Sequence, residues 1–222
     1  MRSKEKTDDW LPILPPGVAT QIYQAIAALE GAALGDRFAV GFASCNHGAG
    51  TSTIAWQFAQ AFAASGTRAV CLVEANCRTP RLAQAVGLRP GPGLADLMQG
   101  RADLETVVQR PGGGKAHVIT AGITGPEGAS MLDRATFGPL LQRIRARFPV
   151  ILFDMAPVLP YPDTAALARL LDGTVLVLRT ERDKREVAQQ AVRVLAEPGA
   201  RVIGVVLNRK PLHIPQWLYK LL

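Results

Sequence analysis

Short, continuously apolar runs alternate along the chain with longer segments in which apolar residues recur every three or four positions. The runs lie at residues 38–44, 68–75, 117–121, 150–154, 174–179 and 201–208. Because both faces of each run are apolar, the pattern predicts strands that are buried on both sides, as in a parallel sheet. Their alternation with helical segments predicts an α/β fold, a doubly wound and mainly parallel sheet in a single domain.

Longer segments with the periodicity of amphipathic helices lie at residues 52–66, 131–148 and 180–197. The first places Ile54, Phe58 and Phe62 on one face and ends at a glycine. In the last, Thr180 and Asp183 have the spacing of a capping box, so we expect that helix to begin at this pair. Stretches rich in glycine and proline separate these elements and predict turns or loops.

Composition adds few constraints to this picture. A chain of 222 residues that is 48% hydrophobic can bury one full core but is short for two ordinary enzyme domains. The net charge of +7 comes from basic residues spread along the chain, which predicts a soluble basic surface and no nucleic-acid partner. No apolar run approaches the ~20 residues that cross a bilayer, and the first residues lack a signal-peptide pattern, so we expect a cytoplasmic location.

The three cysteines, Cys45, Cys71 and Cys77, form neither a CxxC motif nor a Cys/His metal spacing. This pattern predicts reduced, structural thiols and no cysteine–histidine metal centre. Cys45 lies inside a glycine-rich loop, and the sequence leaves open whether its thiol is reactive.

That loop is the main candidate for chemistry. The stretch SCNHGAGTSTIA, residues 44–55, joins the first apolar run to the first helix and has the rhythm of a phosphate-binding loop. Gly48 and Gly50 would let backbone N–H groups face phosphate oxygens, and Ser52 would supply a magnesium ligand. Thr51, however, stands where such loops carry lysine. Losing that charge-assisted bond costs about 1.5–3 kcal/mol in binding and more in a phosphoryl-transfer transition state, so the loop predicts retained binding more readily than catalysis.

A stronger signal comes from five stretches that occur in a fixed order: HGAGTSTIAWQFAQAFA, VCLVEANCRTPRLAQAVGL, GPGLADLMQGRADLETVV, FPVILFDMAPVLPYPDTAALARLLDGTVLVLR and VIGVVLNR. In these stretches the chain resembles the bacterial tyrosine kinases of polysaccharide export, called BY-kinases, which belong to the same group as the septum-site and plasmid-partition ATPases. The resemblance implies a P-loop NTPase-like domain at residues 18–210, between an N-terminal arm at 1–17 and a tail at 211–222. It also implies ATP or ADP with Mg²⁺ as the cofactor.

The resemblance further implies a nucleotide pocket made of Gly48, Ala49, Gly50, Thr51, Ser52, Thr53, Asn208 and Arg209. Ser52, Asp154 and Glu74 are the implied magnesium ligands, and the two carboxylates are the remnants of the catalytic set. Asp163 is also retained, with a helix N-terminal cap as its simpler role. From the residues alone, an alternative stays open in which the glycines and the hydroxyl form only a strand-to-helix turn and bind no cofactor.

Departures from the family pattern fall where the chemistry would be. Besides Thr51 in place of lysine, Asn46 stands where the related partition ATPases carry a second lysine. The paired aspartates of the family become Glu74 and Asn76, and a neutral amide cannot act as a base. Asp154 is retained at the end of its apolar run.

Two further family features are missing. Residues 21–27, QIYQAIA, lack the Glu-x-x-Arg-x-x-Arg motif that builds the family's ring, so ring assembly through that motif is not expected. The tail carries Tyr219 in place of the family's tyrosine cluster. Its apolar residues would form either a partner surface or a segment folded back on the core.

By resemblance, these losses predict a pseudokinase, a non-catalytic regulator or scaffold of bacterial exopolysaccharide or capsule biosynthesis and export. The expected partner is the cytoplasmic part of a membrane chain-length regulator or a related kinase. Through that partner the protein would lie at the periphery of the inner membrane.

Two other functions stay open from the sequence. The chain could be an active ATP-dependent tyrosine autokinase in which Arg78, Arg81, Lys184 or an arginine from a partner replaces the lost lysine. Alternatively, it could be a relative of the partition or positioning ATPases that binds DNA or a membrane through its positive surface. Magnesium-dependent phosphoryl transfer would identify the first, and salt-sensitive DNA binding would identify the second.

Overall fold

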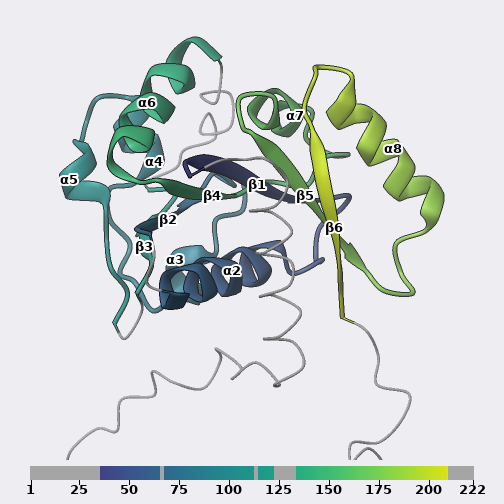
Figure 1. The fold of residues 1–222 in the computed structure, drawn as a ribbon, viewed down its shortest axis with the longest axis horizontal. Coiled ribbons are helices and arrows are strands. Elements are labelled where there is room, and N and C mark those ends of the chain that lie inside the picture. Colours follow the sequence, from purple (N-terminus) through teal and green to yellow (C-terminus); the bar gives the residue numbers. More distant parts are fainter. Residues whose placement is uncertain (1–35, 66–67, 113–114, 123–133, 210–222) are drawn as a thin grey trace, which may run out of the picture.

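The computed structural model describes residues 36–65, 68–112, 115–122 and 134–209. Its strands are β1 (Phe38–Ser44), β2 (Val70–Glu74), β3 (His117–Ile119), β4 (Val150–Asp154), β5 (Gly173–Arg179) and β6 (Val202–Asn208). They form one parallel sheet in the order β3-β2-β4-β1-β5-β6 (Figure 1). Each strand coincides with a predicted apolar run, and the predicted α/β fold with a parallel sheet is confirmed.

The helices are α2 (Thr51–Ser65), α3 (Leu82–Ala85), α4 (Leu94–Met98), α5 (Leu104–Val107), α6 (Arg134–Arg147), α7 (Asp163–Ala168) and α8 (Arg185–Ala196). Figure 1 shows α2 and α3 on one face of the sheet, with α4, α6, α7 and α8 on the other. Both faces of the central strands are therefore covered, as their continuous apolar sequences require. Within the described ranges, none of these helices has the length and hydropathy to span a membrane.

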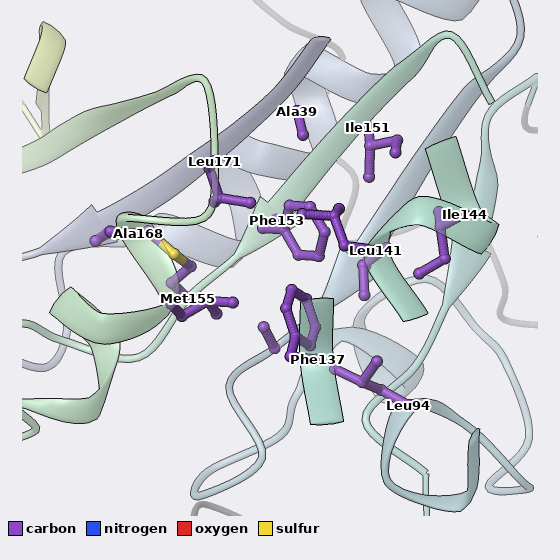
Figure 2. Packing of buried hydrophobic residues seen from close by; sticks show 14 of the residues in the cluster. Ala39, Leu94, Phe137, Leu141, Ile144, Ile151, Phe153, Met155, Ala168 and Leu171 are labelled. Atoms are coloured by element: carbon purple, nitrogen blue, oxygen red, sulfur yellow. The ribbon is translucent and has the colours of Figure 1, made fainter. Parts of the chain in front are cut away.

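Two hydrophobic cores lie on the two faces of the sheet. On the side of α2, the rings of Phe42 and Phe58 pack with centroids 5.0 Å apart. On the opposite side, Phe137 of α6 meets Phe153 of β4 edge to face at 5.7 Å, next to Leu141 (Figure 2). Alternate residues of the same strand thus supply both cores, because successive side chains of a strand point to opposite faces.

The start of α8 differs from the prediction. The capping box of Thr180 and Asp183 does not form, and the helix begins at Arg185 after an N-cap position at Lys184. The Asp183 carboxylate instead accepts a bond from the backbone N–H of Arg179 at 2.7 Å and pairs with its guanidinium at 2.6 Å. The charge-assisted pair engages the carboxylate that would otherwise cap the helix.

The prediction that every strand is buried on both sides is wrong for β6. This strand lies at the edge of the sheet and pairs with β5. Val205 and Leu207 are 53% and 66% exposed, respectively. Apolar sequence alone does not distinguish an edge strand from a central one, because strand order is a property of the whole sheet.

Strand order brings the carboxyl ends of β1, β2 and β4 to one place. β4 lies between β1 and β2, and its last residue, Asp154, is in register with Phe42 of β1 and Glu74 of β2. After β1, the chain continues to β2, which lies on one side of the adjacent strands β4 and β1. After β4, it continues to β5, which lies on the other side of this pair. Ligands of open α/β sheets bind at such a change of direction, at the carboxyl ends of the strands.

We predict that Phe137→Ala lowers the free energy of unfolding by about 3–5 kcal/mol, because it leaves a cavity against Phe153. Urea unfolding followed by circular dichroism measures this change. Val192→Ala is the control, since Val192 is 36% exposed and its truncation should change stability by less than about 1 kcal/mol. Similar losses in the two variants would contradict the assignment of Phe137 to the core.

Candidate functional site

A cleft of about 770 Å³ opens at the carboxyl ends of β1, β2 and β4. Residues 47–53, which are the glycine-rich loop and the start of α2, form one wall. The opposite wall comes from Asn76, Thr79 and the first turn of α3, and Asp154 lies at the floor. The volume lies within the range of about 300–1,000 Å³ that is typical of small-molecule sites.

The glycine-rich loop has the backbone conformation that phosphate loops need. Gly48 and Gly50 have φ angles of 85° and 82°, in the left-handed region that favours glycine. Among the described residues, the N–H groups of residues 48–53 donate no hydrogen bond to a protein acceptor. Those at the start of α2 have no partner within the helix either, because a helix leaves its first N–H groups free. The loop therefore offers a set of N–H donors at the positive end of a helix.

Asn208, which is distant in sequence, holds this loop from the end of β6. Its side-chain N–H donates to the carbonyl of Ala49 at 2.8 Å. A Cβ atom added at Gly50 would lie 2.6 Å from the same nitrogen. Arg209 follows in a left-handed conformation, with a φ of 58°, and lines the cleft. The structure thus brings Asn208 and Arg209, the last two residues of the predicted nucleotide pocket, next to the loop. Asn208 holds the loop, and Arg209 lines the cleft.

Asp154 is a buried carboxylate at the end of β4. Its exposed fraction is 1%, and neither carboxylate oxygen has a partner in hydrogen-bond geometry among the described residues. Burial raises the pKa of Asp154 to about 7; the nearby Ser52 hydroxyl opposes this rise, and the negative charge of Glu74 adds to it. Leaving such a group unpaired is costly unless a cation binds it.

Mg²⁺ fits this position on the chemistry of its donors. A hydroxyl from Ser52 and a carboxylate from Asp154 are hard oxygen ligands, and Mg²⁺ takes one or two carboxylates together with phosphate oxygens and water. Both residues line the cleft next to the loop donors. The predicted ligands Ser52 and Asp154 are thus brought together by the fold.

Glu74, the third predicted ligand, is engaged elsewhere. One of its oxygens accepts the backbone N–H groups of Arg81 and Leu82, each at 2.6 Å, and the other accepts that of Ala121 at 3.0 Å. Burial raises the pKa of Glu74, while these three bonds lower it. Its carboxylate holds the start of α3 and the segment after β3 in place, although it sits in register with Asp154.

Asn76 also makes local contacts. Its side-chain oxygen accepts the backbone N–H of Thr79 at 3.2 Å, and its side-chain N–H donates to the Thr79 hydroxyl at 3.2 Å. Local bonds of this kind, from an asparagine side chain to nearby backbone, are a common role of asparagine in loops. Asn76 therefore shapes the cleft wall, and as an amide it has no basic group for proton abstraction.

The cations that were candidates to replace the lysine lie in different places. Arg81 lines the cleft, across from the loop. Arg78 pairs with Asp163 at 3.1 Å and stacks over the ring of Tyr161 at 4.6 Å. Lys184 occupies the N-cap position of α8. Pro162, not Asp163, is at the N-cap position of α7, so the simple capping role for Asp163 is wrong.

A contact that sequence reasoning missed links the loop to the segment after β4. The His47 ring nitrogen Nε2 lies 3.1 Å from the Tyr161 hydroxyl, and the two rings meet edge to face. The residues are 114 positions apart, and neither has a spacing signal that predicts the contact. Cys45 in the same loop is buried, and burial raises the pKa of its thiol to about 11, which disfavours the reactive thiolate.

Known proteins share this fold and part of this sequence. Tyrosine-protein kinase YwqD of Bacillus subtilis is 30% identical over 165 residues, which cover 74% of this chain and 69% of YwqD. The solved VpsO kinase domain is 27% identical with a TM-score of 0.80, covering 87% of this chain and 95% of that structure. MinD of Pyrococcus horikoshii, solved with Mg-ADP, shares the fold at 19% identity, with a TM-score of 0.65 and coverage of 83% and 76%. No protein-family model matches the chain.

The parallel sheet and the loop between β1 and α2 define a P-loop NTPase-like domain. Within that class, the chain belongs to the family of bacterial tyrosine-protein kinases, the BY-kinases. The resemblance inferred from the ordered motifs is thereby confirmed.

We predict that Asp154→Asn stabilises the protein at pH 8 by about 1–3 kcal/mol. The pKa of Asp154 rises from 3.8 to about 7 on folding. The stability that the protonated group contributes is therefore complete below pH 3.8 and is lost as the pH rises through about 7. Urea unfolding at pH 5 and pH 8 should show a gain that is larger at pH 8.

Asp183→Asn is the matched control for this measurement. The pKa of Asp183 is lowered by its bonds to Arg179, even though burial opposes the shift. Its contribution to stability is present above its unfolded pKa and is lost as the pH falls through the folded value. This variant should therefore be less stable than the wild type at pH 8. A loss of stability at pH 8 in Asp154→Asn would contradict the unpartnered state of that carboxylate.

Proposed function

We propose that the protein is a non-catalytic member of the BY-kinase family that binds a magnesium–nucleotide and regulates bacterial exopolysaccharide or capsule biosynthesis and export. The observation that carries this proposal is the contrast between the two motifs at the cleft. Asp154 is buried at the floor and has no hydrogen-bond partner among the residues that the structure describes, whereas Glu74 and Asn76 make backbone and loop contacts. Of these three residues, Asp154 is thus available to hold a ligand, whereas Glu74 and Asn76 are engaged in contacts that support the fold.

Binding and catalysis make different demands on this cleft. Bound Mg²⁺ would offset the charge of the phosphates, and Ser52 and Asp154 are the residues that would hold it. The N–H groups of residues 48–53 would contact phosphate oxygens. Phosphoryl transfer to a tyrosine additionally needs a base for the hydroxyl proton and a positive charge on the transferred group. Asn76 supplies no base for the hydroxyl proton, and Thr51 supplies no positive charge from within the loop.

The proposed partner follows from the family resemblance. In the BY-kinases, the kinase domain acts on the cytoplasmic side of a membrane-anchored chain-length regulator. We propose that this chain binds such a regulator, or a related kinase, as a scaffold whose state depends on bound nucleotide. Fold alone does not carry function, so this step is an analogy that needs its own experiment.

We predict that calorimetric titration with ADP or ATP gives binding that is at least about tenfold weaker without Mg²⁺. Asp154→Ala should remove the dependence on Mg²⁺, because it removes the carboxylate at the floor of the cleft. Glu105→Ala is a matched control, since Glu105 is an exposed carboxylate of α5, outside the cleft. If the wild type binds no nucleotide at millimolar concentration, the loop has only a structural role, and this part of the proposal is overturned.

We also predict that the purified protein incubated with Mg-ATP forms no phosphotyrosine, as judged by immunoblotting and by transfer of labelled phosphate. The double variant Thr51→Lys, Asn76→Asp restores a cation and a carboxylate and is the positive comparison. Transfer by the wild type that Asp154→Ala abolishes would favour the alternative, an active autokinase with an altered loop.

For the partner, we expect a strain that lacks this protein to make polymer of altered chain length. Because the proposed state of the scaffold depends on bound nucleotide, Asp154→Ala should complement the deletion less well than the wild type, whereas Glu105→Ala should complement it equally well. Normal polymer in the deletion strain would contradict a role in polysaccharide export. Salt-sensitive binding to DNA would instead support the partition-type alternative.

A further inference from the structure

We propose that Arg81 supplies the positive charge for the terminal phosphates of the bound nucleotide, in place of the lysine that Thr51 replaces. This inference rests on the proposed binding of nucleotide at the cleft. It assigns a phosphate-binding role to a residue outside the glycine-rich loop, on the opposite wall.

A bound nucleotide would need positive charge from the residues around the cleft. The phosphates of a nucleotide bring several negative charges, and Asp154 at the floor adds another. Among the described residues, no lysine lines the cleft, and the arginines that line it are Arg81 and Arg209. His47 also lines it, and its ring nitrogen contacts the Tyr161 hydroxyl. Few cations that line the cleft could therefore offset the charge of the phosphates.

The two arginines lie on different sides of the cleft. Arg209 follows Asn208, whose side chain is bonded to Ala49 of the loop. Arg81 precedes α3 on the opposite wall. The Glu74 carboxylate accepts the backbone N–H of Arg81 at 2.6 Å, and Glu74 is in register with Asp154 on the adjacent strand. The backbone of Arg81 is thus held close to the carboxylate that would bind the magnesium ion.

The side chain of Arg81 is free to bind a ligand. Among the described residues, its guanidinium makes no ion pair and no hydrogen bond, and the residue is exposed. Arg78, three positions earlier, differs in this respect because Asp163 and the Tyr161 ring engage its guanidinium. An arginine with a fixed backbone, a free guanidinium and a place in the cleft wall is suited to bidentate contact with phosphate oxygens.

The site also contains a second, independent indication of a charged ligand. The Asp154 carboxylate lines the same cleft, is buried, and has no hydrogen-bond partner within the described ranges. Ser52 and Asp154 are the residues that would hold a magnesium ion, and Arg81 lines the same cleft as both of them. Its guanidinium would therefore be available to phosphate oxygens of a nucleotide bound there.

The test is calorimetric titration of Mg-ADP and Mg-ATP into the wild type and three variants. Arg81→Gln should weaken binding about 10- to 100-fold, since one charge-assisted contact is lost. Arg81→Lys keeps the charge and should lose less affinity than Arg81→Gln. Arg89→Gln, at an exposed position outside the cleft, is the matched control and should bind as the wild type does.

A rescue experiment separates a charge effect from a structural one. Thr51→Lys restores a cation within the loop, so adding it to Arg81→Gln should recover affinity at least about tenfold. Thermal unfolding should be unchanged in Arg81→Gln, because the backbone N–H of Arg81, not its side chain, bonds Glu74.

The outcomes distinguish this inference from the proposed function. If the wild type binds nucleotide and Arg81→Gln binds equally well, the role of Arg81 is overturned while nucleotide binding stands. A further variant, Arg209→Gln, tests the other wall. If it loses affinity and Arg81→Gln does not, the charge comes from Arg209, and the inference is again overturned. If the wild type binds no nucleotide, both proposals are overturned.

Discussion

Three backbone N–H groups converge on the carboxylate of Glu74, and the shape of the cleft depends on this contact. The bonds tie the end of β2 to Arg81 and Leu82 at the start of α3 and to Ala121 after β3. A buried carboxylate tolerates such a position when several donors satisfy its oxygens. The wall opposite the glycine-rich loop is thus built around one side chain.

The neighbouring carboxylate is in the opposite situation. Asp154 lies in register with Glu74 on the adjacent strand, equally buried, but its oxygens have no partner in hydrogen-bond geometry among the described residues. Burial raises the pKa of both groups, and backbone donors offset that rise for Glu74. Two adjacent acids therefore have separate roles, one holding the fold and one left for a cation. Perturbed acids of this kind in a cleft are typical of functional sites, and the buried carboxylate reduces stability when it is ionised.

Several features of the site follow from local sequence. The phosphate loop was predictable because Gly48 and Gly50 are needed for a turn with positive φ between a strand and a helix. The apolar runs predicted the strands because both faces of a central parallel strand are buried. Ordered motifs, not any single one, predicted the family. By contrast, the contact of His47 with Tyr161 and the pairing of Asp183 with Arg179 depend on which segments meet after folding.

The sequence by itself determined the α/β class, the position of the phosphate loop, the family and the replacement of the loop lysine by Thr51. Each of these follows from local pattern and residue type. The tertiary structure decided which groups at the cleft remain available. Glu74 and Asp154 look alike in sequence, yet backbone donors from the start of α3 and from the distant Ala121 satisfy Glu74, while the Asp154 oxygens have no hydrogen-bond partner in the described part of the chain. Likewise, Arg78 and Arg81 differ because one meets an aspartate and an aromatic ring while the other faces the cleft. Such differences arise from contacts between segments far apart in the chain, which local pattern does not encode.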